Sequence, residues 1–412
     1  MMGAMEEASR LDPQAEALLA RLERAGVRPV SEQTPAAARR SGLLLADLAD
    51  QAAGSAAIVR HLNRIPGDDA AGIAAALGLD PGVVAERIAT LAAAGGILSR
   101  PRPDGSTGWT VRIAGRRRAR SAGGALHRLT VEYAIEAATE ETDLGVLLGD
   151  VRDATIAPGV EVRIYRPEGA GTEPLPLILF IHGGGWVIGS IAGYDALCRS
   201  LMAGTGCVVA SAGYRLAPEH PFPAAVEDVE RILLWLLAHA GALGIDPERV
   251  AVAGDSVGGG LATVLAARAR DEAWCRVLAQ VLLYPVTDAT RALPSYETHR
   301  DAPLLSRADM EWYYRHYAPP AGDWRASPLH LPDLTGLPPA LFLLAEVDPV
   351  HDDGVAWADR LRGAGIATEV VDYPGSFHGF ALFAPALDAA VDAQARGSTF
   401  LRAHLRPGGT AG

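Results

Sequence analysis

The sequence predicts an α/β fold with a mostly parallel central sheet. Two short apolar runs, Leu175–Phe180 and Arg249–Ala253, are typical of buried strands. The second run leads into Gly259–Ala267, whose small apolar residues favour a helix. A third apolar run, Pro339–Ala345, ends close to the dipeptide Asp348-Pro349. Strands that are followed by helices are the units from which parallel sheets are built.

A serine lies at the turn between the second strand and its helix. Ser256 stands between Gly254 and Gly258, which is the G-x-S-x-G pattern of a nucleophile elbow. Glycine relieves the crowding of such a tight turn, and the helix N-terminus directs free N–H groups at negative charge. Chance alone gives about 0.2 such matches in a chain of this composition. A glycine-rich turn with a bystander serine is therefore the alternative.

A second glycine motif follows the first strand. Residues 182–186 are His182-Gly183-Gly184-Gly185-Trp186, and chance gives only about 0.01 such H-G-G-G strings. Consecutive glycines allow close approach of the backbone to a ligand, and their N–H groups can stabilise a tetrahedral oxyanion. The two motifs together indicate acyl-transfer chemistry.

A serine nucleophile needs a base, and in this arrangement the chain order is Ser, then Asp or Glu, then His. His378 is the candidate base, because it lies in a turn directly after the apolar segment Thr368–Tyr373. Three other histidines downstream of the serine, His330, His351 and His404, are expected to be solvated surface residues.

Asp348 is the candidate orienting carboxylate, because it ends an apolar run and precedes a proline. Three acidic residues compete with it. Glu346 alternates with Asp348 on one strand face, while Asp352 and Asp353 begin the expected helix Asp352–Arg362, where acids usually stabilise the N-terminus.

Residues 151–407 resemble the bacterial hormone-sensitive-lipase-like esterases, which are α/β-hydrolases. The motifs that carry the resemblance are His182–Trp186, Tyr214–Ala224, Gly254–Gly258, Ala326–Leu329 before Leu337–Pro339, Asp348-Pro349 and His378–Phe380. The resemblance implies hydrolysis of a small-molecule carboxylic ester of short to medium chain length, without a cofactor or a metal. It implies Ser256 as nucleophile, Asp348 as orienting acid and His378 as base.

The resemblance also implies oxyanion donors and substrate contacts. The donors are the backbone N–H groups of Gly184, Gly185 and Val257. Substrate contacts are expected from Trp186, Asp255 and Phe380, although core packing explains the two aromatic residues equally well. The stretch Tyr214–Ala224 is expected to be a packed structural loop.

Two positions depart from the family pattern. Val257 stands where the family usually has alanine, and its branched side chain is expected to narrow the acyl pocket or tilt the N–H donor. Gly213 stands where the family usually has aspartate before Tyr214-Arg215, so a supporting hydrogen bond is expected to be lost.

Length and composition limit the number of domains and the kinds of partner that we expect. A chain of 412 residues suggests two or three domains, and 49% hydrophobic with 21% charged residues is a globular composition. The net charge of −12 argues against generic binding to nucleic acids or membrane surfaces. Three cysteines in apolar settings, Cys198, Cys207 and Cys275, fit free thiols in a cytoplasmic protein. The sequence contains no apolar run of about 18 residues and no signal-peptide pattern, so no membrane segment is expected.

Three domains are expected: residues 1–41, 42–148 and 149–412. Residues 1–41 resemble the N-terminal lid segment of the family, with Leu11-Asp12-Pro13 capping a helix over Ala15–Ala25. A second lid piece is expected at about 287–317, within the catalytic domain 149–412. Residues 42–148 are an insertion relative to the family.

The insertion resembles the winged-helix domain of MarR-type transcription regulators. Helices are expected over Gly42–Asn63, Ala70–Leu77 and Asp80–Ala94, a hairpin with a turn at Asp104-Gly105, and a long closing helix over Arg116–Leu148. Seven arginines between residues 100 and 120 supply a basic patch. The expected recognition helix, however, offers only Arg87 and Thr90 to base edges. A lid or homodimerisation module is therefore favoured, and the alternative is a ligand-sensing DNA-binding regulator that uses the hydrolase pocket as its receptor.

Overall fold

The computed structural model describes residues 11–24, 31, 33–35, 85, 88, 97–101, 107–111 and 150–406, apart from 168 and 385. The chain divides into two compact units. One contains Met1–Ala46 together with Val151–Gly412, and the other contains Asp47–Asp150. Within the described residues, no helix is both long and apolar enough to span a membrane.

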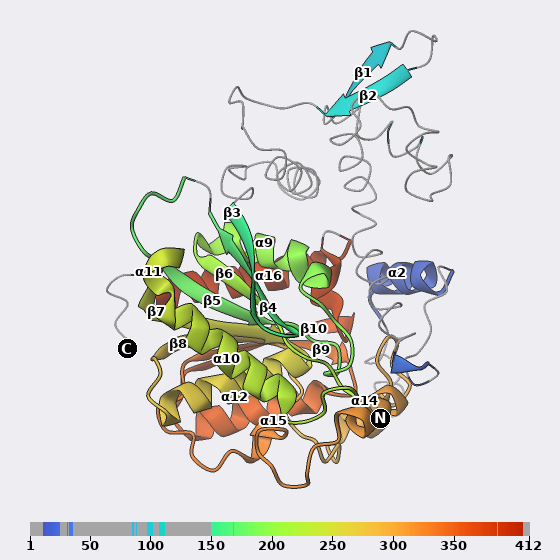
Figure 1. The fold of residues 1–412 in the computed structure, drawn as a ribbon. Coiled ribbons are helices and arrows are strands. Elements are labelled where there is room, and N and C mark those ends of the chain that lie inside the picture. The colour runs from blue at the N-terminus through green and yellow to red at the C-terminus, as the bar shows by residue number, and fades with distance from the viewer. Residues whose placement is uncertain are drawn as a thin grey trace. The chain divides into compact units, whose positions relative to one another are not determined.

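An eight-stranded sheet forms the centre of the first unit (Figure 1). Its strands are β3 (Asp150–Ala157), β4 (Val160–Arg166), β5 (Leu175–Ile181), β6 (Val208–Gly213), β7 (Ile245–Asp255), β8 (Val277–Leu283), β9 (Ala340–Val347) and β10 (Thr368–Phe377). They lie in the order β10-β9-β8-β7-β5-β6-β4-β3. All pairings from β10 to β6 are parallel, whereas β4 pairs antiparallel with β6. The predicted mostly parallel α/β sheet is therefore confirmed.

Helices cover both faces of this sheet (Figure 1). One face carries α9 (Asp195–Thr205) and α16 (Asp388–Leu405), which pack against each other. The other carries α10 (Ala224–Ala238), α12 (Val257–Asp271) and α15 (His351–Gly363). Shorter elements are α11 (Ala240–Leu243), α13 (Ser295–Thr298) and the 3-10 helices η2 (Ala192–Tyr194), η3 (Pro328–His330) and η4 (Phe380–Phe383).

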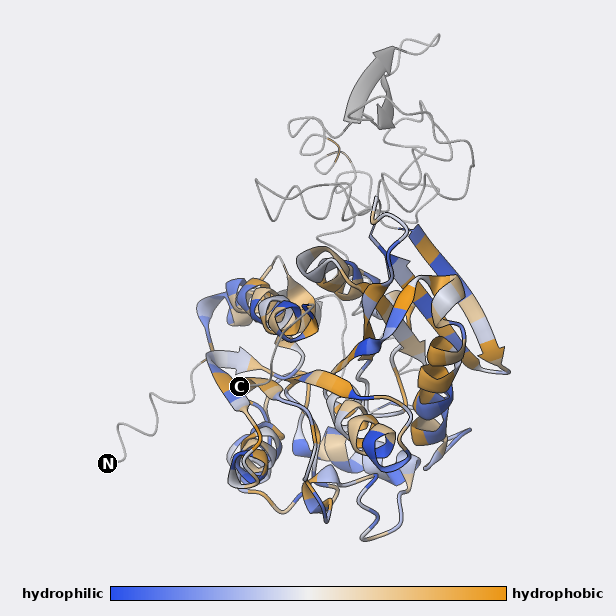
Figure 2. Ribbon diagram, turned by 90° about the vertical axis from the view of Figure 1, so that its left-hand side faces the viewer, coloured by the Kyte–Doolittle hydropathy of each residue, from blue (hydrophilic) through white to orange (hydrophobic). Residues whose placement is uncertain are grey.

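The apolar strands form the core because they are covered on both sides. In β5, every residue from Leu177 to Ile181 is fully buried, which explains why this strand is continuously apolar rather than alternating. The edge strand β4 alternates more clearly between buried and exposed positions. Figure 2 shows hydrophobic and hydrophilic residues on different sides of the outer helices, as expected for helices that cover a sheet.

Two helical segments correspond to the expected lid pieces. Helix α2 (Pro13–Arg24) agrees with the predicted capped helix, since Asp12 Oδ1 accepts the Gln14 N–H at 2.8 Å. Asp12 N–H donates to the Gly375 carbonyl at 2.9 Å, so this helix begins beside the end of β10, the strand that precedes His378. Helix α14 (Arg307–Tyr317) lies in the second piece. That these segments act as a lid stays a prediction.

The second unit contains a two-stranded antiparallel sheet of β1 (Ile97–Pro101) and β2 (Thr107–Val111). This pairing agrees with the predicted hairpin. Within the expected helix Asp80–Ala94, the described residues Ala85 and Ile88 are helical. The remaining predicted helices of the insertion, and its arginines between residues 112 and 120, lie outside the described residues.

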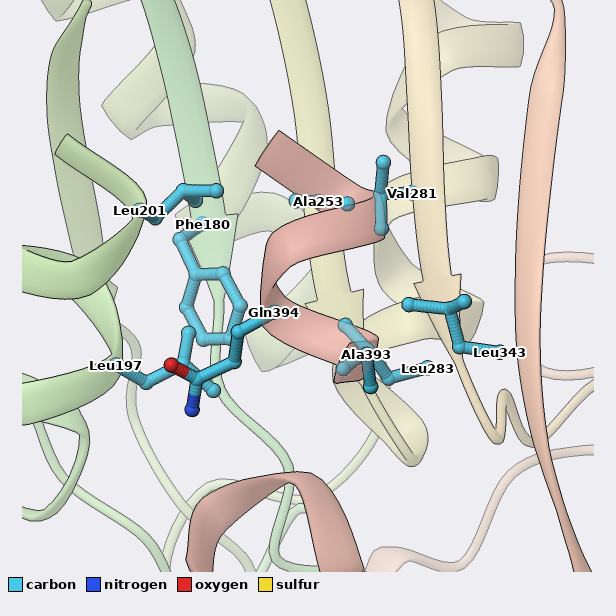
Figure 3. Close-up of a pocket in the computed structure, with 10 residues that line it drawn as sticks. Phe180, Leu197, Leu201, Ala253, Val281, Leu283, Leu343, Ala393 and Gln394 are labelled. Atoms are coloured by element: carbon cyan, nitrogen blue, oxygen red, sulfur yellow. The ribbon is translucent and has the colours of Figure 1, made fainter. Parts of the chain in front are cut away.

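A small apolar cavity of about 20 Å³ lies between the sheet and helices α9 and α16 (Figure 3). Its lining residues are Phe180, Leu197, Leu201, Ala253, Val281, Leu283, Leu343, Ala393, Gln394 and Gly397. Gly397 is an interior residue of α16. A methyl group added there would lie 3.4 Å from Val281 Cγ1 and 4.0 Å from Leu343 Cδ1, which are ordinary contact distances.

We therefore expect Gly397→Ala to stabilise the protein. Alanine in a helix interior is favoured over glycine by about 1 kcal/mol, and the buried methyl adds roughly 0.8 kcal/mol. Thermal unfolding should show a melting temperature that is higher by roughly 2–4 °C. Gly354→Ala in α15 is the matched control, because a methyl there would collide with Leu344 Cδ2. An equal response of the two variants would contradict the packing argument.

Candidate active site

Ser256 stands at the junction of β7 and α12 in a strained backbone conformation. Its φ of 54° and ψ of −127° are rarely adopted by a non-glycine residue. A side chain at Gly254 would strike the Gly258 carbonyl, and one at Gly258 would strike the Ile181 carbonyl. Glycine is thus required at both flanks because the backbone itself occupies the space.

The three residues predicted for the triad lie within hydrogen-bond distance of one another. Ser256 Oγ is 2.8 Å from His378 Nε2, and His378 Nδ1 is 2.7 Å from Asp348 Oδ2. Asp348 is fully buried, and its other oxygen accepts the Val350 N–H at 2.9 Å. These contacts fix the imidazole with one nitrogen towards the carboxylate and the other towards the hydroxyl.

The competing carboxylates have other partners. Glu346 Oε2 accepts the Gly375 N–H at 2.7 Å. Asp352 Oδ2 accepts the Ser295 N–H at 3.0 Å. Asp353 is fully buried and accepts two N–H groups from residues 287–288 at 2.8 Å. Both aspartates lie in the first turn of α15. Glu346 thus binds the end of β10, whereas the two aspartates bind the expected second lid piece.

The prediction of a solvated surface histidine is wrong for His351. Its side chain is only 20% exposed and lies between Asp352 and Asp372, with nitrogen–oxygen distances of 3.0 Å to each. The two carboxylates come from different elements, so the sequence around His351 did not reveal this arrangement. His404 bonds to the carbonyl of Phe400 one helical turn earlier at 2.9 Å.

The glycines after His182 adopt left-handed backbone conformations, with φ of 101° at Gly184 and 60° at Gly185. A side chain at Gly185 would collide with the ring of Tyr313 from α14. Among the residues that the structure describes, none accepts a hydrogen bond from the N–H of Gly184, Gly185 or Val257. These three donors therefore have no protein acceptor within the described chain.

The two departures from the family pattern have structural explanations. The Val257 side chain is fully buried in the hydrophobic core cluster, which does not support the expectation that it narrows the acyl pocket. A side chain at Gly213 would lie 2.8 Å from Ile191 Cδ1. Ile191 therefore fills space that an aspartate at position 213 would need.

The three residues expected to contact substrate make buried contacts within the protein. Trp186 stacks on Tyr317 at 4.1 Å with an interplanar angle of 2°. Phe380 is fully buried, with ring centroids of Tyr284 and Tyr373 at 5.6 and 4.9 Å. These contacts favour core packing for both aromatic residues.

Asp255 also binds protein groups with its carboxylate. Its carboxylate accepts the Gly183 N–H at 2.7 Å and the Tyr194 hydroxyl at 3.0 Å. Burial raises the pKa of Asp255 to about 6. Sequence reasoning did not select Tyr194, because no fixed spacing connects it to either glycine motif.

The loop Tyr214–Ala224, which was predicted to be structural, contacts the first residue of the glycine motif His182–Trp186. His182 stacks on Tyr214 at 4.3 Å, and the Tyr214 hydroxyl donates to the His182 carbonyl at 2.8 Å. Burial lowers the pKa of His182 to about 4, so this histidine is neutral at physiological pH. Arg215 pairs with the fully buried Asp228 through two guanidinium bonds of 2.7 Å.

In the described part of the chain, no cluster of His, Cys, Asp and Glu could hold a metal ion.

Comparison with known proteins identifies the family. Residues 178–382 match the family described as alpha/beta hydrolase fold. Carboxylesterase NlhH from Mycobacterium tuberculosis is 39% identical over 252 residues, which are 60% of this chain and 79% of that protein. The chain therefore belongs to this α/β-hydrolase family.

Other similar proteins carry related names. An ethyl acetate hydrolase from Pseudomonas putida is 45% identical over 228 residues, which are 53% of this chain and 70% of that protein. The crystal structure of a thermostable carboxylesterase from a metagenomic library has a TM-score of 0.61 and 39% identity, covering 69% of this chain and 97% of that one. The esterase family expected from the motifs is thus confirmed, whereas the winged-helix resemblance of the insertion stays a prediction.

The bridged His351 generates a pH prediction. Hydrogen bonds first to Asp372 and then to Asp352 raise the pKa of His351 to about 9, from an ordinary 6.5. Because the folded-state pKa is raised, the bridge stabilises fully below about pH 6.5 and is lost as the pH rises through about 9. We expect His351→Gln to lower the free energy of unfolding by roughly 1–2 kcal/mol at pH 6.5, after allowance for solvent screening.

Urea denaturation of wild type and variant across pH 6.5–10 measures this effect. The difference between them should shrink towards zero at pH 10. His404→Gln is the matched control and should show no such trend. A wild-type advantage that stays constant over this pH range would contradict the charged bridge.

Proposed function

We propose that this chain is a serine carboxylesterase that hydrolyses short- to medium-chain carboxylic esters through an acyl-enzyme. The chain is a carboxylic ester hydrolase by its relatives, which are named carboxylesterase and ethyl acetate hydrolase. The observation that carries the mechanism is the hydrogen-bonded line from Ser256 through His378 to Asp348, with distances of 2.8 and 2.7 Å.

In the acylation step, His378 Nε2 takes the Ser256 proton while Oγ attacks the ester carbonyl carbon. Asp348 holds Nδ1–H and stabilises the imidazolium that forms. The carbonyl oxygen becomes an oxyanion, and the N–H groups of Gly184, Gly185 and Val257 are the proposed donors to it. His378 then protonates the departing alkoxide as the carbon–oxygen bond breaks.

In the deacylation step, water takes the place of the alcohol. His378 removes a proton from the water, hydroxide adds to the acyl carbon, and the same three N–H groups stabilise the second oxyanion. Collapse of this intermediate breaks the bond to Ser256 Oγ, which recovers its proton from His378. The products are one carboxylic acid and one alcohol, and no cofactor takes part.

Replacement of the nucleophile or the base should abolish turnover. We expect Ser256→Ala and His378→Ala to lower kcat on p-nitrophenyl butyrate by roughly 10⁴- to 10⁶-fold, because each removes a group that participates in bond making. Asp348→Asn should cost about 10⁴-fold, since it favours the wrong imidazole tautomer. Stopped-flow release of p-nitrophenol measures all three.

Matched controls separate chemistry from packing. Ser398→Ala removes another buried serine, which contacts Gly204 on α9, and should leave kcat unchanged. Wild-type protein without activity on any ester from acetate to octanoate would overturn the proposed function. Full activity of Ser256→Ala would overturn its mechanism while leaving the reaction intact.

We further propose that the insertion, expected at residues 42–148, serves the esterase as a lid-shaping or homodimerisation module. Its separation into a compact unit, Asp47–Asp150, supports a self-contained module. The β1–β2 hairpin is compatible with a wing, so the alternative of a DNA-binding regulator is kept as an outcome of the test.

Measurements of mass and of DNA binding on the full-length protein distinguish these roles. We expect light scattering to give the mass of a dimer, and no mobility shift of random duplex DNA at low salt. A salt-sensitive shift that disappears in the triple variant Arg116→Ala, Arg117→Ala, Arg118→Ala would favour the regulator instead. A monomer whose chain-length profile is unchanged by deletion of 42–148 would exclude both favoured roles.

A further inference from the structure

A buried hydrogen-bond network joins the nucleophile turn to the glycine loop. Asp255 Oδ1 accepts the Gly183 N–H at 2.7 Å, and its Oδ2 accepts the Tyr194 hydroxyl at 3.0 Å. The Gly183 N–H also lies 3.2 Å from the Tyr194 oxygen, which closes a triangle. Asp255 and Tyr194 are 2% and 7% exposed, so water does not compete for these bonds.

The two segments that this network joins approach each other at backbone level. Strands β5 and β7 are neighbours, and Ile181 pairs with Gly254 at their carboxyl ends. A side chain at Gly183 would lie 2.7 Å from Asp255 Oδ2 and 3.0 Å from Ser256 Cβ. The carboxylate of Asp255, the residue before the nucleophile, therefore lies directly against Gly183 at the start of the glycine loop.

We infer that Asp255 and Tyr194 are positioning residues that hold the oxyanion donors at the correct distance from Ser256. Consecutive glycines have the greatest backbone freedom, whereas oxyanion donors must lie within about 2.7–3.1 Å of the developing charge. The Asp255 bond fixes the loop at its Gly183 N–H. At the other end, the Gly184 carbonyl accepts N–H groups of Val187 and Ile188 at 3.1 and 2.9 Å.

This assignment replaces direct substrate contact by Asp255, because both of its carboxylate oxygens already bind protein donors. It extends the proposed ester hydrolysis and rests on it, since the donors matter only if an oxyanion forms at Ser256. Tyr194 takes no part in the making or breaking of bonds. Its hydroxyl orients the carboxylate, so its removal should loosen the loop without removing a reacting group.

The test compares Tyr194→Phe with a control substitution of Tyr165 on strand β4, whose hydroxyl also binds an aspartate. Tyr165 is fully buried, and its hydroxyl donates to the partly exposed Asp195 at 2.8 Å, so Tyr165→Phe removes a Tyr–Asp hydrogen bond that does not involve Asp255. Active sites are first counted by titration with a fluorophosphonate, which makes every kcat a value per competent site. The substrate is p-nitrophenyl butyrate, and a trifluoromethyl ketone serves as the oxyanion-forming inhibitor.

We expect Tyr194→Phe to lower kcat per site by about 10-fold with little change in KM, because the loss falls on the transition state. The inhibition constant of the trifluoromethyl ketone should rise by the same factor. Asp255→Asn retains one acceptor oxygen and should be more active than Asp255→Ala, which should lose about 10²-fold. Tyr165→Phe should leave kcat per site and ketone affinity unchanged.

Three results would overturn the inference. One is a Tyr194→Phe variant with wild-type kcat per site, even if the number of competent sites falls, because that indicates a folding role alone. Another is an equal loss in Tyr165→Phe. The third is a loss of kcat without any loss of ketone affinity. Failure of wild type to hydrolyse esters would instead contradict the proposed function, and the ketone affinities alone would then decide the positioning role.

Discussion

The close approach of two backbone turns at the ends of β5 and β7 is the constraint on which the rest of the site depends. At Gly254 and Gly258, the space that a side chain would need is already filled by main-chain carbonyl groups. Ser256 can therefore occupy its positive-φ conformation only if Gly254 and Gly258, two residues away on either side, lack a Cβ atom. The same crowding brings Gly183 against Asp255, so the nucleophile turn and the glycine loop form a single rigid corner. This corner holds both the proposed nucleophile and the proposed oxyanion donors.

Sequence reasoning succeeded where the cause of a structural feature is local. The continuous burial of β5, the two flanking glycines and the acidic residue at the end of β9 each leave a pattern within about ten residues. Those patterns predicted the parallel sheet and the residues that the structure brings together at Ser256. The capped helix α2 and the hairpin β1–β2 also followed from local capping and turn signals.

Features that depend on distant partners could not be predicted in this way. His351 of α15 contacts Asp372 of β10, and Trp186 stacks on Tyr317 of α14, which lies far along the chain. Nothing near either residue encodes the partner, so His351 was predicted to be solvated, and for Trp186 substrate contact and core packing were both left open. Tyr194 was missed for the same reason, since its acceptor Asp255 is 61 positions away. Side-chain contacts of this kind are set by tertiary packing, which a single sequence does not reveal.

The division of the chain into two units affects the entropy cost of folding the catalytic unit. Residues Asp47–Asp150 interrupt the catalytic unit between Ala46 and Val151, yet the hydrogen bond from Asp12 to Gly375 still ties the leading segment to the far end of the sheet. The entropy cost of closing a loop rises only with the logarithm of its length, by about 0.6 kcal/mol for each doubling. A long insertion at this point therefore adds little to the loop-closure cost of ordering the catalytic unit.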